Sequence, residues 1–77
     1  MEFIDGAVSS KNYDFIVVNS SCELSQLTGS VGSEDLLSAY NLSGKTISAG
    51  IVISGRNGGK ILAVDVSSGS VIGYTFL

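Results

Sequence analysis

In the C-terminal part of the chain, residues 46–54 place an apolar residue at every second position, which is the period of a β-strand. Ile47, Ala49, Ile51 and Ile53 are separated by single residues, and further runs cover residues 61–66 and 71–76. Asn57-Gly58 between the first two runs is the preferred sequence of a two-residue hairpin turn. A second turn signal, Ser67-Ser68-Gly69, precedes the last run. The pattern predicts a three-stranded antiparallel β-meander.

Turn length fixes the register that this meander would have. A two-residue turn at Asn57-Gly58 pairs Ile53 with Leu62, and a slip of one residue would move apolar side chains to the wrong face. A three-residue turn with Gly69 in the left-handed conformation pairs Val64 with Ile72. The core face is then predicted to comprise Ile51, Ile53, Leu62, Val64, Val66, Ile72, Tyr74 and Phe76. The opposite face is predicted to comprise Gly50, Val52, Ile61, Ala63, Asp65, Val71, Gly73, Thr75 and Leu77.

The opposite face is the candidate contact surface. It is small, flat and partly apolar, and its glycines would let another backbone approach closely. The residues expected to form the contact are Val52, Ile61, Ala63, Val71 and Gly73.

The N-terminal residues predict one firm strand. Residues 13–19 are apolar on both sides, which is typical of a central strand that is covered on two faces. Residues 1–12 are weakly patterned. Phe3-Ile4 and Ala7-Val8 flank Asp5-Gly6, and this segment can form a hairpin, an edge strand or an arm that reaches a neighbour.

Residues 20–45 predict a helical connection. Ser20 followed by Glu23 fits a capping box, with Gly29 ending a short helix; an irregular strand that uses Cys22 and Leu24 is the alternative. Residues 33–40 predict a better helix, with Ser33 as its N-cap and one apolar face.

Together these elements predict one small domain over residues 1–77. Its fold class is α+β and β-rich: an antiparallel sheet of at least four strands that ends in the C-terminal three-stranded meander. One or two short helices cover one face.

The composition indicates that the domain hides apolar surface against something else. The hydrophobic fraction is 44% and charged residues make up 14%, against an average of about 25%. Domains of this size have marginal cores and gain stability from disulfides, metals or partner subunits. A single cysteine and the lack of histidine exclude an internal disulfide and a cysteine- or histidine-rich metal site. That leaves self-association or a well-packed core, and a homo-oligomer is the simpler expectation.

The formal net charge of −3, with four basic residues, argues against a nucleic-acid partner. No apolar run is long enough for a transmembrane helix, and the residues after Met1 do not open a secretory signal. With Met1 as the native start, we expect the protein to be intracellular (cytoplasmic), and a lone thiol agrees with that.

Three motifs could carry chemistry. Residues 39–46 satisfy a relaxed phosphate-loop pattern, but that site needs a helix after the loop, and here a strand is expected, which leaves Lys45 solvated. The glycine turn with Arg56 and Lys60 could hold an anion, although a solubilising hairpin tip is the better interpretation. Cys22 has no histidine to activate it and is expected to be a buried small hydrophobe.

Residues 59–72 are similar to the strand–turn–strand of a quinoprotein-type propeller blade. Their Gly-Gly-Lys-Ile opening also resembles the end of small phycobilisome linker domains. Each resemblance covers under a quarter of the chain and reduces to a generic hairpin, so neither assigns a family.

The leading functional hypothesis is a non-enzymatic binding and assembly protein that self-associates through a sheet face. One alternative is a small inhibitor or regulator of a single protein partner, such as phages and mobile elements encode. The other is an anion or nucleotide binder at the glycine-containing turns. No cofactor is expected, and no nucleophile–base pair can be named for catalysis.

Overall fold

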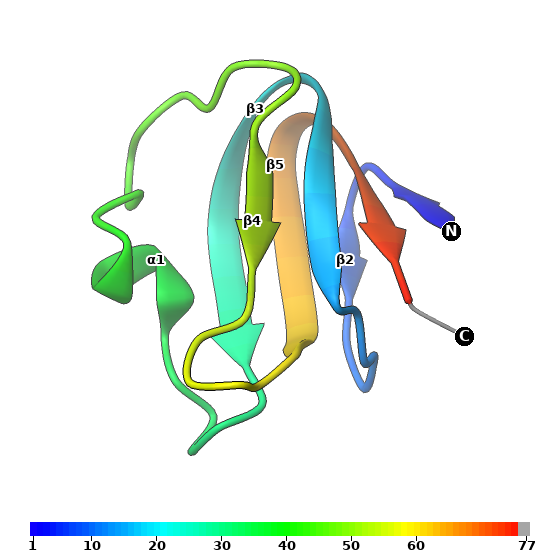
Figure 1. Ribbon diagram of the computed structural model, residues 1–77. Coiled ribbons are helices and arrows are strands. Elements are labelled where there is room, and N and C mark those ends of the chain that lie inside the picture. The colour runs from blue at the N-terminus through cyan, green and yellow to red at the C-terminus, as the bar shows by residue number, and fades with distance from the viewer. Residues whose placement is uncertain (76–77) are drawn as a thin grey trace.

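The computed structural model describes residues 1–75 and is mostly β, with a five-stranded antiparallel sheet and one short helix among these residues (Figure 1). The strands lie in the order β1-β5-β3-β4, and β2 also pairs with β5. The elements are β1 (Glu2–Ile4), β2 (Ala7–Val8), β3 (Phe15–Gly29), α1 (Leu36–Ala39), β4 (Val52–Ser54) and β5 (Ile61–Tyr74).

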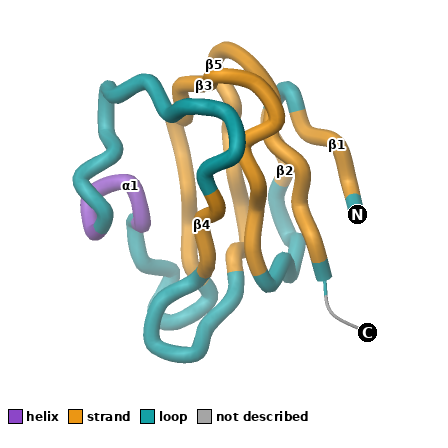
Figure 2. The backbone as a smooth tube through the Cα atoms, turned by 45° about the horizontal axis from the view of Figure 1, so that its top comes forward, coloured by secondary structure: helices purple, strands orange, loops and turns teal. Residues whose placement is uncertain are grey.

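The two long strands, β3 and β5, carry the architecture. They pair from Phe15 opposite Tyr74 to Gly29 opposite Ile61, with several register shifts between Val18 and Gln26. Both strands bend at the same end of the molecule, so one sheet folds into two layers (Figures 1 and 2). The first layer contains β1, the second half of β5, the first half of β3, and β4. The second layer contains the other halves of β3 and β5, and β2.

The bend depends on a glycine. Gly69 has φ +80°, in the left-handed region, as expected from the sequence. A Cβ atom at this position would lie 2.2 Å from the carbonyl oxygen of Ser21 and 2.8 Å from Cα of Cys22. Irregular residues inside a ladder bend the strand and increase its twist. The second turn signal therefore marks a bend within β5 and not a turn between two strands.

The core lies between the two layers and beneath α1. In the first layer, Ile4, Ile16, Val18, Ile53 and Val71 point inward. The second layer and the connection add the remaining large side chains: Cys22, Leu24, Leu27, Leu36, Leu37, Ile47, Ile61, Val64 and Val66.

The predicted C-terminal meander is wrong. Asn57 and Gly58 do form a tight turn with φ of 55° and 75°, closed by the Gly59 amide, which donates to the Arg56 carbonyl at 2.8 Å. However, β4 pairs with β3, where Ile16 lies opposite Ile53, so β3 separates β4 from β5 in the sheet. The predicted second and third strands of the meander are one continuous strand, β5.

Because β4 and β5 do not pair with each other, several of their residues lie on a different face from the one predicted. Ile61, Val71, Ala63 and Gly73 are buried, whereas Ile51 is exposed. Leu62, Ile72 and Tyr74 are only partly buried. The assignments of Phe76 and Leu77 lie outside the described residues. The physical reason is that pairing with β3, and not the hairpin turn, decides which side of β4 and β5 faces the core.

Both helices predicted within residues 20–45 also need correction. Residues 20–29 form strand and not a capped helix, which was the alternative interpretation, and Cys22 and Leu24 are buried. The helix is shorter than predicted, and its N-cap is Asp35 and not Ser33: the Asp35 carboxylate accepts hydrogen bonds from the amides of Leu37 and Ser38. Carboxylates at this position satisfy amides that have no partner within the helix.

The N-terminal segment forms edge strands, the second of the three alternatives. β1 and β2 both pair with β5 and not with each other. The expected central strand over residues 13–19 differs in its bounds, because β3 begins at Phe15 and continues to Gly29. Its central position is confirmed, since β3 lies between β5 and β4. Its outward side chains, Phe15 and Val17, are not fully covered. Within residues 1–75, no helix has the length and apolar character needed to span a membrane.

A polar cluster fastens β1 to the body of the molecule. The Tyr13 hydroxyl donates a hydrogen bond to the carboxylate of Glu2, and the Lys11 ammonium lies 3.2 Å from Oε1 of Glu2. The Tyr13 ring is itself buried and packs where Gly73 has no side chain: a Cβ there would lie 2.6 Å from the ring. The hydrogen bond from Tyr13, with help from Lys11, lowers the pKa of Glu2. Burial and the same hydrogen bond raise the pKa of Tyr13.

These interactions predict a dependence of stability on pH. Because the folded-state pKa of Glu2 is lowered, its stabilising effect is present at neutral pH and is lost as the pH falls through that value. Urea unfolding midpoints, measured from neutral pH down to about pH 3, should fall less steeply for Glu2→Gln than for the parent. Glu23→Gln, at an exposed position of β3, is the matched control and should follow the parent. Parallel curves for the parent and Glu2→Gln would refute the role of Glu2.

Candidate functional site: an apolar outer sheet face

Apolar side chains form a row across all four strands of the first layer. Phe3 lies opposite Ile72, Ile72 opposite Val17, and Val17 opposite Val52. Residues directly opposite each other in neighbouring strands project to the same face and contact each other. The row therefore runs without interruption from β1 at one edge to β4 at the other.

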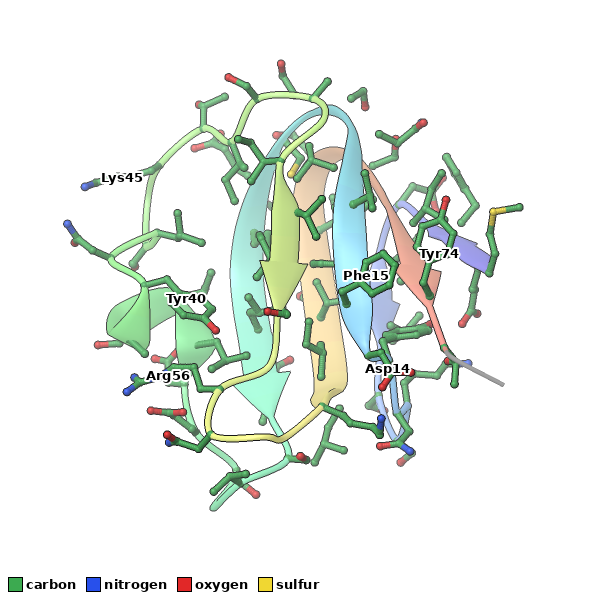
Figure 3. The ribbon with its side chains drawn as sticks, viewed as in Figure 1. Asp14, Phe15, Tyr40, Lys45, Arg56 and Tyr74 are labelled. Carbon is green, nitrogen blue, oxygen red and sulfur yellow. The ribbon has the colours of Figure 1, made fainter. Side chains whose placement is uncertain are left out.

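A second row lies two residues further along the strands. Phe15 is paired with Tyr74 on one side and with Ser54 on the other. The rings of Phe15 and Tyr74 are stacked, with centroids 4.9 Å apart and planes 12° apart, and they lie side by side over neighbouring strands (Figure 3). Aromatic stacking of this kind adds about 1 kcal/mol to the burial of the rings.

Both rows face away from the core. Their neighbours along each strand, such as Ile16, Ile53 and Val71, are buried. Side chains alternate between the two faces of a strand, so the rows point outward. Phe3 is 58% exposed and Val52 60% exposed. We call the six apolar members of the two rows the outer face: Phe3, Phe15, Val17, Val52, Ile72 and Tyr74. No charged side chain belongs to this set.

The corresponding surface of the second layer is different. Its outward side chains are mostly polar: Glu23, Ser25, Gln26, Thr28, Asp65 and Ser67. The two small apolar residues Ala7 and Ala63 share this surface, opposite Asp65 and Thr28. The molecule thus has two outward sheet surfaces, one for each layer, and one is apolar while the other is mostly polar. Soluble proteins seldom leave a contiguous apolar patch exposed unless it binds something. The outer face is therefore the candidate functional site.

Only one of the predicted contact residues belongs to this site. Val52 lies on it, whereas Ile61, Ala63, Val71 and Gly73 are buried inside the chain. Sequence reasoning missed Phe3, Phe15 and Val17, because they come from segments far from residues 46–77, and it placed Ile72 and Tyr74 on the core face. One signal was available: residues 15–18 are apolar on both sides of the strand, which implies that something covers both faces.

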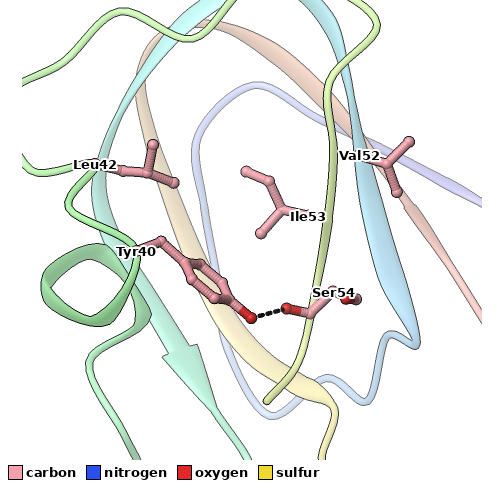
Figure 4. Close-up of a pocket in the computed structure, with 5 residues that line it drawn as sticks. All are labelled: Tyr40, Leu42, Val52, Ile53 and Ser54. Carbon is pink, nitrogen blue, oxygen red and sulfur yellow. Dashed lines mark hydrogen bonds between the residues drawn. The ribbon is translucent and has the colours of Figure 1, made fainter.

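A groove lies beside β4, next to the outer face (Figure 4). Its volume is about 280 Å³, and it is lined by Tyr40, Leu42, Val52, Ile53 and Ser54. The Tyr40 hydroxyl donates a hydrogen bond of 2.7 Å to the Ser54 carbonyl, which ties the connection after α1 to the edge of the sheet. None of the lining residues is charged. The groove can accept an apolar side chain but offers no acid–base pair.

The structure does not assemble the three candidate anion-binding cations into one site. Arg56 lies 2.9 Å from a carboxylate oxygen of Glu34, and Lys60 forms an ion pair with Asp14. Lys45 is exposed and forms no ion pair with the residues described here. Figure 3 shows Lys45 and Arg56 on the side of α1 and Asp14 near the opposite edge. Carboxylate partners reduce the positive potential that an anion would need.

Cys22 has the predicted environment. It is buried in the core, and burial raises the pKa of its thiol, which disfavours the reactive thiolate. Among residues 1–75, no group of three His, Cys, Asp or Glu side chains is placed to hold a metal ion.

Comparison of the chain with models of protein families, with curated proteins and with solved structures finds no match.

Proposed function

We propose that this protein is a non-enzymatic binding and assembly protein that self-associates through the outer face. The observation that supports the proposal most strongly is the contrast between the two sheet surfaces. Phe3, Val17 and Val52 lie in a continuous apolar row, whereas the outward residues of the second layer are mostly polar. Burial of apolar surface is the main driving force for protein association.

Small size adds a reason for self-association. A chain of 77 residues has a modest core, without an internal disulfide to reinforce it. A second subunit that binds only the folded state stabilises that state by mass action. Covering the outer face would therefore support the fold as well as form the assembly.

Val52→Asp is the sharpest test of the proposed surface. Val52 is 60% exposed, so a carboxylate there can stay hydrated in the monomer but must lose water in the assembly. We expect the parent to associate reversibly in sedimentation equilibrium, and Val52→Asp to weaken this association by about tenfold or more. The urea unfolding midpoint of the diluted, monomeric variant should stay close to that of the parent.

Val31→Asp is the matched control. Val31 is 46% exposed and lies in the connection after β3, away from the outer face. This variant introduces the same charge and should leave the association unchanged. A parent that stays monomeric would contradict the proposal, and so would an equal effect of the two substitutions.

The groove favours a second candidate function, an inhibitor or regulator that binds one other protein. Its uncharged lining beside the edge strand β4 could receive an apolar side chain of a partner. The two candidates differ in native mass. Copurification of one stoichiometric partner with a parent that does not self-associate would support the second candidate.

A further inference from the structure

We propose that a second copy of this chain packs face to face on the outer face with its strands reversed, so that β4 of one copy lies over β4 of the other. This inference rests on the proposed function and specifies the arrangement of the same contact.

The relief of the outer face selects this arrangement. On the two central strands, one row holds the larger side chains, the stacked rings of Phe15 and Tyr74, and the other holds the smaller Val17 and Ile72. The difference in size makes the ring row the higher one. Two identical surfaces pack closely when high regions of one meet low regions of the other. A two-fold axis perpendicular to the strands places Val17 over Phe15 of the second copy and Ile72 over its Tyr74. The same axis keeps β4 over β4.

The other two-fold arrangement fits poorly. An axis parallel to the strands would place β3 over β5 and β4 over β1 of the second copy. The Phe15 ring would then meet the Tyr74 ring of the second copy, and Val17 would meet its Ile72. Rings on rings would hold the two sheets apart and leave a gap over the aliphatic row, which loses dispersion contacts.

Charge and symmetry are compatible with a second copy as the occupant. The six side chains of the outer face are uncharged, so contact between two copies removes no charged group from water. A two-fold contact uses the same patch on both subunits and closes at a dimer. Sheets stacked in this way lie about 10 Å apart.

The size of the face sets the expected strength of the dimer. Four strands about 4.8 Å apart and two rows about 7 Å apart give a footprint of about 19 by 14 Å, or roughly 270 Å². This is about a third of the roughly 800 Å² that each partner buries in a standard interface. We therefore expect a weak, rapidly reversible dimer and not a permanent one.

Thiol cross-linking distinguishes the two arrangements. In reversed stacking, Val52→Cys lies close to the same residue of the second copy, and a short bismaleimide should link the variant to itself. In the other stacking, Val52→Cys would lie near Phe3→Cys, so a mixture of these two variants should link preferentially. We expect self-linking of Val52→Cys to be at least about tenfold faster than mixed linking with an affinity-tagged Phe3→Cys.

The parent and Ser25→Cys are the controls. The thiol of Cys22 is buried, so the parent should not link, and Ser25 lies on the polar surface of the second layer. Faster mixed linking would overturn the arrangement, and so would linking of Ser25→Cys at the rate of Val52→Cys. In either case, a dimer detected by sedimentation would still support the proposed function. A parent that is monomeric at all concentrations would overturn both.

Discussion

Gly69→Ala is expected to lower the free energy of unfolding by about 2–5 kcal/mol, the sum of a left-handed backbone penalty and a steric clash. Gly69 has φ +80°, and an added Cβ would lie 2.2 Å from the carbonyl oxygen of Ser21. The contacted atoms belong to the backbone at the bend of β3, so they cannot rotate away as a side chain could. Urea unfolding at constant protein concentration measures the effect.

Gly50→Ala separates the two causes of this loss. Gly50 has φ +91°, but nothing lies within 4 Å of the position that its Cβ would occupy. This control should show the conformational penalty alone, about 1–2 kcal/mol. Equal losses in the two variants would show that the close packing of the two bends is not what makes Gly69 necessary.

Ile61→Ala should destabilise the protein by about 2–5 kcal/mol, the cost of removing a large side chain from a packed core. Ile61 is fully buried where β5 begins, next to Tyr13. Ile51→Ala is the matched control, because Ile51 is 47% exposed and its loss should cost less than about 1 kcal/mol. The sequence pattern alone predicts the opposite order, with Ile51 in the core and Ile61 on a contact surface.

Chemical unfolding and sedimentation together decide between these assignments. A lower unfolding midpoint for Ile61→Ala confirms its place in the core. An unchanged unfolding midpoint together with weakened association would instead indicate that Ile61 lies on a contact surface, and this result would contradict the structure.

Local backbone features could be predicted from the sequence because neighbouring residues determine them. Asn57-Gly58 forms its tight turn, and Gly69 adopts the left-handed conformation. The hydrophobic character of Cys22 likewise predicted its burial.

Strand pairing could not be predicted in the same way. A hairpin turn brings two strands close together, and the turn at Asn57-Gly58 therefore suggests that β4 pairs with β5. In the structure β4 pairs instead with residues 15–17 of β3, which are apolar on both sides of the strand. The run from Ile61 to Val64 is apolar at every position, so alternation does not decide which side of β5 faces the core. The predicted faces therefore depend on a pairing that does not form.

The outer face was beyond local reasoning for the same reason. Its first row depends on three pairings between four separate segments: Phe3 with Ile72, Ile72 with Val17, and Val17 with Val52. Low charge and small size predict an apolar sheet face in general terms. Only the order and register of the strands identify the residues that form this face.

Sedimentation equilibrium of the unmodified chain, from micromolar to millimolar concentration, tests the central claim most directly. A second copy covering the outer face predicts a mass that rises with concentration from the monomer, 7.9 kDa, toward twice that value. A mass that stays at the monomer value over the whole range would contradict the claim that this protein assembles through its apolar sheet face.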